Sequence, residues 1–599
     1  MDSTTQLTAL RTGITTPVRT SGTPVHASGP PPSPGPGEIS RSGSLVYDPA
    51  EPSGSLHLRA ARVLNGNWTG TSTVPSRGLY PHQWSWDSAF IAIGLRHLSP
   101  LRAQTELETL LGAQWADGRV PHIVFNPSVP LDAYFPSPDF WRSSTAGRAA
   151  GAPRTVQTSG IVQPPVHALA VWLVHRADPG LSRARNFLPR MYPRLAAWHR
   201  YLLHRRDLGG RGLASVAHPW EQGMDNSPCW DAPLSRITPA PARSFRRADL
   251  DHGAPEDRPT DLDYGRYVRL ATDYRDRGYA DGGGEFAVED PAFNALLIAS
   301  EHALACIAQE LGATGTARHA RAERLTAALV DRLWDPAEGM FFCRDVYGAG
   351  DGAGAGAGES GALGSERCSP SSALGSERCS QNGALGSERR SQSRDGHGSD
   401  PHPENPESSA LTPEHRSQST AHLSEHRPPQ SNALASEHRS LRGALIPERS
   451  VSGLLPLILP ALPRDIAATL VRTASGPHFE LGGAARLVPS YDLTGDAFDP
   501  HRYWRGPAWF NTNWLLARGL RLHGEHGRAD GLREALLRTA DESGFAEYVD
   551  PYSGEACGAL GFSWTAALTL DLLHEPPGHG VSPTGLGTFV KSDKGGDRG

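Results

Sequence analysis

Apolar residues recur every three to four positions along much of the chain, the spacing of helices that bury one face. The first such stretch starts near residue 54 and places Leu56, Ala60, Ala61 and Leu64 on one side. Similar stretches start near residues 88, 100, 166, 193, 290, 316, 464, 507, 528 and 561. Strict alternation of apolar and polar positions is scarce, so the pattern predicts an all-α protein of about a dozen helices.

Capping residues mark several of the expected helix starts. Asp290 precedes Pro291, which places an aspartate at the N-cap and a proline at the first helical position. Asp87 or Ser88 is expected to cap the helix that follows, and Pro193 is expected to open another. The polar stretch 240–285, with DGGG at 281–284, is assigned no helix.

Loops between the expected helix pairs carry most of the aromatic and acidic residues. Helical hairpins closed into a ring, an (α/α)6 barrel, would gather such loops at one end. An α-solenoid would also use helix pairs, but it predicts similar repeats, which these helices do not show. The expected fold is therefore an (α/α)6 barrel with a catalytic domain in two parts, 46–347 and 450–576.

Three segments are expected to stay outside this domain. Residues 1–45 and 577–599 are polar tails, and 348–449 is a low-complexity insert. The insert repeats ALGSER from Ala362, Ala373 and Ala384, with a single leucine in each repeat. Because such segments bury too little apolar surface to offset their ordering entropy, they are expected to be disordered.

Composition excludes several classes of function. The net charge of −6 offers no basic surface for nucleic acid, and no run of 18 apolar residues predicts a membrane span. The six cysteines form no CxxC pair, and the N-terminus lacks the apolar region of a signal peptide, so a cytoplasmic protein is expected. No nucleotide-binding loop or metal-ligand cluster is present, so no cofactor is expected.

The segment His218–Trp230, HPWEQGMDNSPCW, has the composition of a pocket loop. It holds Glu221 and Asp225 between Trp220 and Trp230, and its prolines and glycine disfavour both helix and strand. Indole rings stack on sugars, and burial beside a ring raises the pKa of a carboxyl, as a general acid requires. A surface turn with a capping aspartate would use the same residues, and this alternative stays open.

Four loops combine aromatic with polar side chains: Tyr80–Asp87, Trp220–Asp225, Tyr503–Trp509 and Gly544–Tyr548. Such loops suit carbohydrate, because ring faces take the C–H side of a sugar while carboxylates and amides take its hydroxyls. Any one of these loops is more simply explained by packing. Four of them at helix starts favour a binding site.

Glycoside hydrolysis usually needs two carboxyl groups, one on each side of the bond that breaks. Asp225 is the expected general acid, and its partner should come from a distant loop. Six acids late in the chain are candidates: Asp492, Asp496, Asp499, Glu547, Asp550 and Glu555. Glu547 is preferred because Phe545 and Tyr548 flank it.

In several of its sequence motifs the chain resembles the glucosylglycerate and mannosylglycerate hydrolases, relatives of processing α-glucosidase I in glycoside hydrolase family 63. The likeness covers about 55–347 and 449–575. It rests on YPHQWSWDSAF (80–90), TSGIVQPP (158–165), WEQGMDNSPCWD (220–231), RPTDLDYGRY (258–267), DPAFNALL (290–297), RYWRGPAW (502–509), GFAEYVDPYSGEACG (544–558) and FSWTAAL (562–568). Trehalases share a looser version of these motifs. Two features depart from the family pattern: the insert, and Cys229 where arginine is expected.

The resemblance implies an (α/α)6 barrel and an inverting mechanism, with Asp225 as acid and Glu547 as the base that activates water. It also implies which residues hold the sugar: Tyr80, Trp84, Ser85, Trp86, Asp87, Gly223, Tyr503 and Trp504. Trp220 and Trp509, from the aromatic loops, join them as candidates. Tyr134, Gln163 and Arg258 match positions that meet the glycerate, and Tyr264 matches a mobile lid.

The expected partner is a small anionic glycoside, because the guanidinium of Arg258 can grip a carboxylate with two parallel hydrogen bonds. An ordinary salt bridge in a polar loop is the alternative for Arg258. We therefore expect hydrolysis of glucosylglycerate, and also of mannosylglycerate. A trehalase or oligosaccharide α-glucosidase is the second hypothesis, and a non-catalytic carbohydrate-binding or scaffold protein the third. The sequence leaves a homo-oligomer open.

Overall fold

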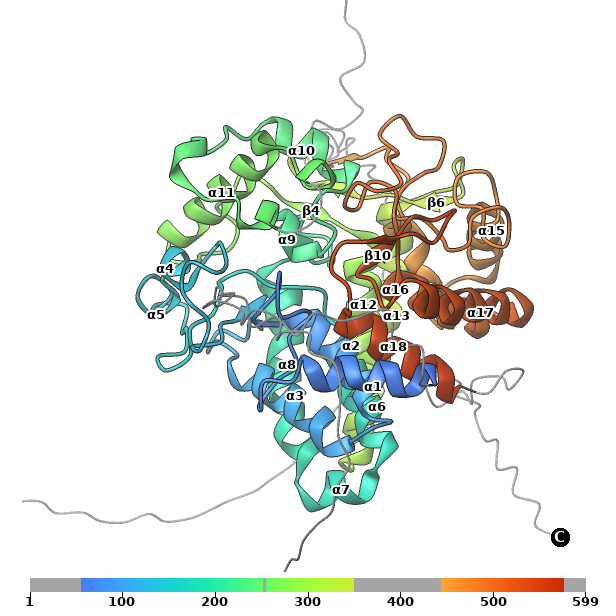
Figure 1. Cartoon of the computed structure of the whole chain (residues 1–599), viewed down its shortest axis with the longest axis horizontal. Coiled ribbons are helices and arrows are strands. Elements are labelled where there is room, and N and C mark those ends of the chain that lie inside the picture. The colour runs from blue at the N-terminus through green and yellow to red at the C-terminus, as the bar shows by residue number, and fades with distance from the viewer. Residues whose placement is uncertain (1–54, 252–254, 349–442, 576–599) are drawn as a thin grey trace, which may run out of the picture. The chain divides into compact units, whose positions relative to one another are not determined.

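The computed structural model describes residues 55–251, 255–348 and 443–575 (Figure 1). All of them belong to one compact unit that starts at Ser53. The two expected tails, 1–45 and 577–599, and nearly all of the expected insert, 348–449, lie outside the described residues.

The described chain is rich in helices, as its periodicity predicted. The longer helices are α1 (Leu56–Gly66), α2 (Ser85–Leu95), α3 (Pro100–Gly112), α6 (His167–Ala177), α8 (Phe187–Arg205), α11 (Asp261–Asp276), α12 (Pro291–Glu310), α13 (Thr316–Leu333), α15 (Arg464–Ala474), α16 (Phe510–Leu522), α17 (His526–Glu542) and α18 (Ser563–His574). The shorter α-helices are α4 (Pro138–Trp141), α5 (Ser143–Ala146), α7 (Pro179–Ala184), α9 (Pro219–Gln222) and α10 (Asp231–Ser235). The 3-10 helices are η1 (Pro228–Trp230), η2 (Ala242–Ser244), η3 (Ala248–Asp251), η4 (Pro255–Asp257) and η5 (Val451–Ile458).

Six segments are buried on nearly every side and pack on one another in turn. They are α2, α6, α12, η5, α16 and α18, and α18 packs back on α2. Helices with only one buried face lie outside them: α3 on α2, α8 on α6, α13 on α12, α15 on η5, α17 on α16 and α1 on α18. A helix that is apolar all round must be enclosed by its neighbours, whereas an amphipathic helix keeps one face in water. The two kinds of helix therefore form an inner and an outer layer.

α12 is the longest of the enclosed helices. By length and composition alone it could cross a membrane, but 89% of its apolar stretch is buried inside the protein. Asp290 caps it as the sequence predicted, since its Oδ1 accepts a hydrogen bond from the backbone N–H of Phe293 at 2.7 Å.

Three local predictions were wrong. α2 begins at Ser85, with Trp84 at its N-cap, so Asp87 and Ser88 lie in its first turn and cap nothing. Pro193 lies inside α8, because apolar residues before it, from Phe187 on, already pack into the core. α11 occupies part of the polar stretch, where the side chain of Thr260 caps it. Few of its residues are aliphatic, so its buried tyrosines left no clear periodic signal.

The all-α prediction also missed four small antiparallel sheets. Their strands have two residues each, too short for alternation to show: β1 (Gln83–Trp84), β2 (Ile123–Val124), β3 (Ser215–Val216), β4 (Val288–Glu289), β5 (Trp334–Asp335), β6 (Met340–Phe341), β7 (Arg344–Asp345), β8 (Ala444–Leu445), β9 (Ala508–Trp509), β10 (Tyr548–Val549) and β11 (Ala556–Cys557). Three strands lie just before inner helices: β1 directly precedes α2, β9 directly precedes α16, and one residue separates β4 from α12. The sheets therefore fix the backbone where these inner helices begin.

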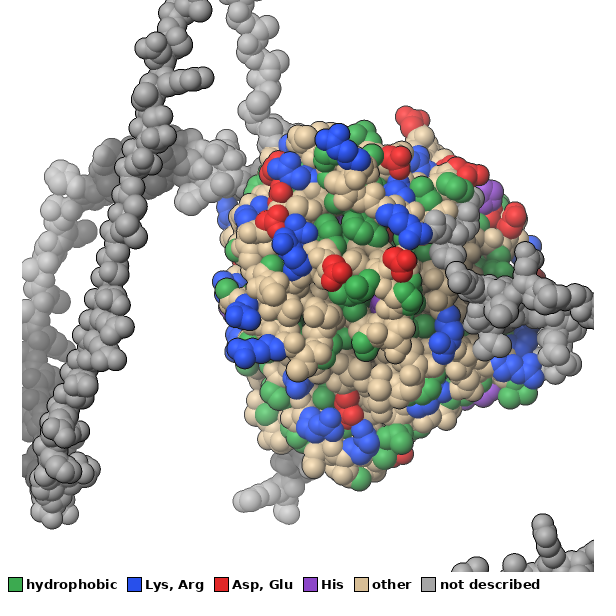
Figure 2. Space-filling model, turned by 60° about the vertical axis from the view of Figure 1, so that its left-hand side comes forward, with side chains coloured by type: hydrophobic (Ala, Val, Ile, Leu, Met, Phe, Trp, Pro, Cys, Tyr) green, Lys and Arg blue, Asp and Glu red, His purple; other side chains and the backbone are tan. Residues whose placement is uncertain are grey.

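Figure 2 shows one face of the molecule, on which acidic and basic side chains are interspersed.

Candidate active site

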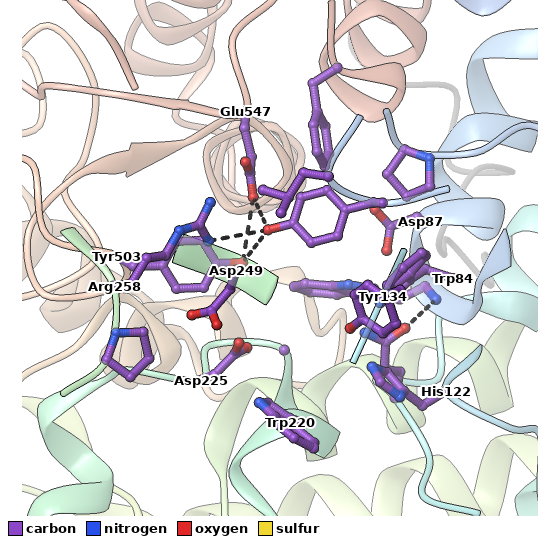
Figure 3. Close-up of a pocket in the computed structure, with 18 of the residues that line it drawn as sticks. Trp84, Asp87, His122, Tyr134, Trp220, Asp225, Asp249, Arg258, Tyr503 and Glu547 are labelled. Carbon is purple, nitrogen blue, oxygen red and sulfur yellow. Dashed lines mark hydrogen bonds between the residues drawn. The ribbon is translucent and has the colours of Figure 1, made fainter. Parts of the chain in front are cut away.

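A pocket is lined by residues from loops that lie hundreds of positions apart in the sequence (Figure 3). Its lining consists of Pro75, Leu79, Tyr80, Trp84, Trp86, Asp87, His122, Tyr134, Phe135, Gln163, Trp220, Gly223, Asp225, Asp249, Arg258, Pro259, Tyr264, Tyr503, Glu547, Phe562 and Trp564. The space between these walls, counted out to the open mouth and with open solvent included, is about 840 Å³. Aromatic rings and carboxylates share the lining, as a carbohydrate site requires.

All but three of the predicted site residues line this pocket. Ser85 is fully buried, and its Oγ lies 3.0 Å from Nε2 of His167, away from the cavity. The rings of Trp504 and Trp509 stack on each other, with centroids 3.9 Å apart, and are buried outside the lining. The structure therefore places these three side chains outside the pocket lining, and their predicted contact with substrate stays a prediction.

The acid-bearing segment turns sharply at Gly223, directly after the single turn of α9. Its φ of +80° lies in the left-handed region, which side chains other than glycine rarely adopt. A Cβ at this position would lie 2.6 Å from Cζ2 of Trp86. Gly223 therefore lets the backbone pass against an indole of the pocket and aims Asp225 into the cavity.

The two acids of this segment have different surroundings. Glu221 is fully buried outside the pocket, where its Oε1 and Oε2 accept hydrogen bonds from Nη2 and Nη1 of Arg206 at 2.6 and 2.5 Å. It also accepts the backbone N–H groups of Val162 and Ala217. Glu221 thus ties the start of the acid loop to α8 and to the extended segment before Gln163. This leaves Asp225 as the acid of the motif that faces the pocket.

Burial raises the pKa of Asp225 from its usual range to about 7. The charge of Arg258 opposes this shift, whereas the charges of Glu547 and Asp249 add to it. The hydroxyl of Tyr267 donates to the backbone carbonyl of Asp225 and holds the residue from behind. A carboxyl with this pKa keeps its proton in a large share of molecules at neutral pH, which suits a general acid.

Glu547 lies across the pocket from Asp225 (Figure 3). Its Oε1 accepts the hydroxyl of Tyr80 at 2.9 Å, and its Oε2 accepts the backbone N–H of Ala559 at 3.0 Å. Burial raises the pKa of Glu547, and the charge of Arg258 with these hydrogen bonds opposes the rise. Two donors directed at the carboxylate favour its ionised form, which suits a general base.

Arg258 is a buried cation beside the two carboxyls. Its Nη1 lies 3.3 Å from the hydroxyl of Tyr80, and its guanidinium lies 4.7 Å from the centre of the Tyr503 ring. Only 6% of the residue is exposed. Arg258 is thus part of the pocket wall, not a member of a surface salt bridge, so the alternative interpretation of this residue is wrong.

Several lining residues escaped the sequence analysis. Phe562 and Trp564 belong to the FSWTAAL motif and could have been chosen from it. Asp249 lies in the polar stretch 240–285, and His122 lies in a long loop, with no motif to single them out. Burial lowers the pKa of His122 to about 3, so this imidazole is neutral near pH 7. Sequence reasoning found the residues of the motifs and missed those placed by the path of the chain.

Cys229, the departure from the family pattern, is a buried residue near the end of the acid-bearing segment His218–Trp230. Its Sγ lies 3.5 Å from Oγ of Ser450 and 3.8 Å from the carbonyl of Glu448. The small side chain packs against the segment that leads into η5, outside the pocket lining.

Within the described residues, no three His, Cys, Asp or Glu side chains form a group that could hold a metal ion.

Comparison with protein families matches residues 80–363 and 414–565 to the mannosylglycerate hydrolase MGH1-like glycoside hydrolase domain. A mannosylglycerate hydrolase of Rubrobacter radiotolerans is 36% identical over 536 residues, which cover 88% of this chain and 99% of that protein. A glucosylglycerate hydrolase of Mycolicibacterium hassiacum is 34% identical over 545 residues, which cover 88% of this chain and all of that protein.

A solved structure agrees with these sequence matches. The crystal structure of a family 63 mannosylglycerate hydrolase from Thermus thermophilus, in complex with Tris and D-glycerate, superposes with a TM-score of 0.63 at 33% identity. The match covers 86% of this chain and all of that one. The relatives are thus similar over nearly their whole length.

Proposed function

Because the chain belongs to the mannosylglycerate hydrolase MGH1-like family of glycoside hydrolases, we propose that it hydrolyses α-glycosides of D-glycerate. Glucosylglycerate is the proposed substrate, with mannosylglycerate as a second one, and hexose and D-glycerate are the products. The observation that carries the proposal is the composition of the pocket: Asp225, Glu547 and Arg258 line one cavity. Two carboxyls supply acid and base, and the cation supplies a partner for the glycerate carboxylate.

The proposed reaction is a single displacement with inversion. Asp225 gives its proton to the glycosidic oxygen as the bond to the sugar breaks, so glycerate leaves as an alcohol. Glu547 takes a proton from the water that attacks the opposite face of the sugar. The two carboxyls of inverting enzymes stand about 6.5–9.5 Å apart to leave room for this water. Each turnover consumes one water and leaves Asp225 to be reprotonated and Glu547 to be deprotonated.

We also propose that the inner and outer helical layers form an (α/α)6 barrel with the pocket at one end. The order of packing supports this, since each inner segment contacts the next and the last contacts the first. Loops that precede the inner helices then meet above the ring. Tyr80, Asp225 and Glu547 come together for this reason, although they are far apart in the sequence.

The proposed role of Arg258 is recognition of the substrate's carboxylate. A planar guanidinium with its charge buried in the pocket can donate two parallel hydrogen bonds to a carboxylate. Tyr134 and Gln163 line the same cavity, and Oε1 of Gln163 accepts the backbone N–H of Trp86 at 3.1 Å. That bond directs the amide nitrogen of Gln163 away from this backbone group, so the nitrogen can donate to a ligand oxygen.

The first test is direct hydrolysis. Purified protein is incubated with glucosylglycerate, mannosylglycerate and trehalose, and the released anomer is followed by proton NMR. We expect the β-anomer to appear first from glucosylglycerate. In Asp225→Asn and Glu547→Gln, turnover should fall by about 10²–10⁴-fold, because general acid–base catalysis contributes that much. Circular dichroism should show an unchanged fold, and full activity in either variant would remove the role assigned to that residue.

The second test separates a glycerate hydrolase from a trehalase. Arg258→Ala should lower kcat/KM for glucosylglycerate by about tenfold to a hundredfold, because a charged hydrogen bond contributes about 1.5–3 kcal/mol. Arg258→Lys, which keeps the charge and loses the paired donors, should fall between this variant and the wild type. Equal losses on trehalose and glucosylglycerate would contradict the assignment. Binding of all three sugars without hydrolysis would support the non-catalytic alternative.

A further inference from the structure

Asp249 lies on the same side of the pocket as Asp225, and the proposed reaction gives its carboxylate no role (Figure 3). It comes from η3, in the segment that precedes α11. The side chain of Asp249 is 19% exposed, so most of it is enclosed. A charge placed there acts on the pocket through protein more than through water.

Arg247 holds Asp249 in place with two hydrogen bonds. Its Nε lies 2.9 Å from Oδ1 and its Nη2 lies 2.8 Å from Oδ2 of the aspartate. The same guanidinium bonds Oδ1 of Asp261 at 2.7 Å and lies 4.3 Å from the centre of the Tyr264 ring. This pairing holds the carboxylate of Asp249 in a fixed position. Asp249 lines the pocket and Arg247 does not, so the negative end of the pair faces the cavity that holds Asp225.

Asp225 is surrounded by charged and titratable groups from several elements. Those that interact with it are Arg258, Glu547, Asp249, Tyr134, Tyr264, Tyr267 and Tyr503. The tyrosines are buried and neutral at ordinary pH, because burial raises their pKa values. Of the charged neighbours, Arg258 favours the carboxylate form of Asp225, whereas Glu547 and Asp249 favour its protonated form.

We propose that Asp249, clamped by Arg247, is a positioning residue whose fixed negative charge favours the protonated form of Asp225 between turnovers. This inference rests on the proposed function, in which Asp225 gives up its proton in every cycle. After that step Asp225 is an anion beside Arg258, a pairing that would leave it ionised. The fixed charge of Asp249 counters this pairing, and reprotonation from water restores the acid.

The test measures the proton on Asp225 without any substrate. Difference infrared spectra of wild type against Asp225→Asn isolate the carboxylic acid C=O band of Asp225 and cancel other buried acids. The band should disappear with a midpoint near the pKa of Asp225, about 7. In Asp249→Asn, measured against the Asp225→Asn/Asp249→Asn double variant, the midpoint should fall by about one pH unit, because a nearby like charge is removed.

Asp261→Asn is the matched control. It removes the same charge and another hydrogen bond to Arg247, but Asp261 is 73% exposed and lies outside the pocket lining. We expect no shift of the Asp225 band in this variant. An unshifted midpoint in Asp249→Asn, or an equal shift in Asp261→Asn, would overturn the inference.

Activity then separates this inference from the proposed function. With glucosylglycerate, the basic limb of the kcat/KM profile of Asp249→Asn should move to lower pH with its infrared midpoint. A shifted band in a protein that hydrolyses none of the three glycosides would refute the proposed function alone. An unshifted band in an active enzyme would refute the role of Asp249 alone.

Discussion

The surroundings of Asp225 and Glu547 differ in ways that suit the different tasks proposed for these two carboxyls. Asp225 keeps its proton because burial and neighbouring negative charges disfavour its ionised form. Glu547 is more enclosed, with 1% of the residue exposed, but the hydroxyl of Tyr80 and the amide of Ala559 donate to its oxygens. Hydrogen bonds to a carboxylate favour the charged form, whereas burial alone favours the neutral one. The environment of each residue thus fits the role proposed for it, acid for Asp225 and base for Glu547.

This difference predicts the pH dependence of activity. The general acid must be protonated, so kcat/KM should fall as pH rises through the Asp225 pKa of about 7. The general base must be ionised, so activity should also fall in acid. Because burial raises the pKa of Glu547, this acidic limb should lie above the usual range of a glutamate. A kcat/KM profile of glucosylglycerate hydrolysis measures both limbs, and constant activity from about pH 7 to 10 would contradict the assignment of the acid.

At the scale of elements, α8 positions the acid loop through a buried ion pair. Arg206 at the C-cap of α8 binds Glu221 in α9 with two hydrogen bonds, and both side chains are at most 1% exposed. Asp281 lies 3.0 Å from Nε of the same guanidinium. Removing one partner of such a pair leaves the other charge buried without its full compensation.

Glu221→Gln should therefore lower the free energy of unfolding by about 3–5 kcal/mol, because Arg206 loses its paired counter-charge. It should also lower kcat, since α9 leads directly into the turn at Gly223. Urea unfolding and steady-state kinetics measure the two effects. Glu542→Gln, which removes an exposed pair with Arg486, is the control and should cost at most about 1 kcal/mol. Equal losses in the two variants would show that Glu221 does not position the loop.

At the scale of the whole molecule, the described segments before and after residues 349–442 meet in one sheet. β7 and β8 pair antiparallel, with Arg344 opposite Leu445 and Asp345 opposite Ala444. Residues 349–442 connect these strands, and the family match omits 364–413. The pocket is built from residues on both sides of this connection, and every lining side chain belongs to the described domain.

Replacing residues 349–442 with a short Gly/Ser turn should thus leave kcat/KM for glucosylglycerate unchanged. Stability should rise by about 2 kcal/mol, because each halving of a loop saves about 0.6 kcal/mol of closure entropy. Enzyme kinetics and urea unfolding of the shortened protein measure these outcomes. Loss of activity in a protein that still folds would contradict the prediction.

The sequence by itself determined the helical character of the chain and most of the pocket. Helical periodicity is local, so it appears along single stretches such as those of α1 and α12. Motif residues such as Asp225 and Glu547 could be chosen because burial of a carboxyl beside aromatic rings has a recognisable composition. The same local rules missed α11 and misplaced the start of α8, where packing against distant residues outweighed a polar composition and a proline.

Only the tertiary structure decided which members of each motif face the cavity. Tyr503 lines the pocket while Trp504 and Trp509 stack behind it, and Asp225 faces the pocket while Glu221 pairs with Arg206. Neighbours in sequence point in different directions once the backbone turns, as it does at Gly223. Asp249 enters the site because Arg247 holds it there, and no local pattern encodes that contact. Which side chains meet depends on how distant segments pack, and this is a property of the folded chain.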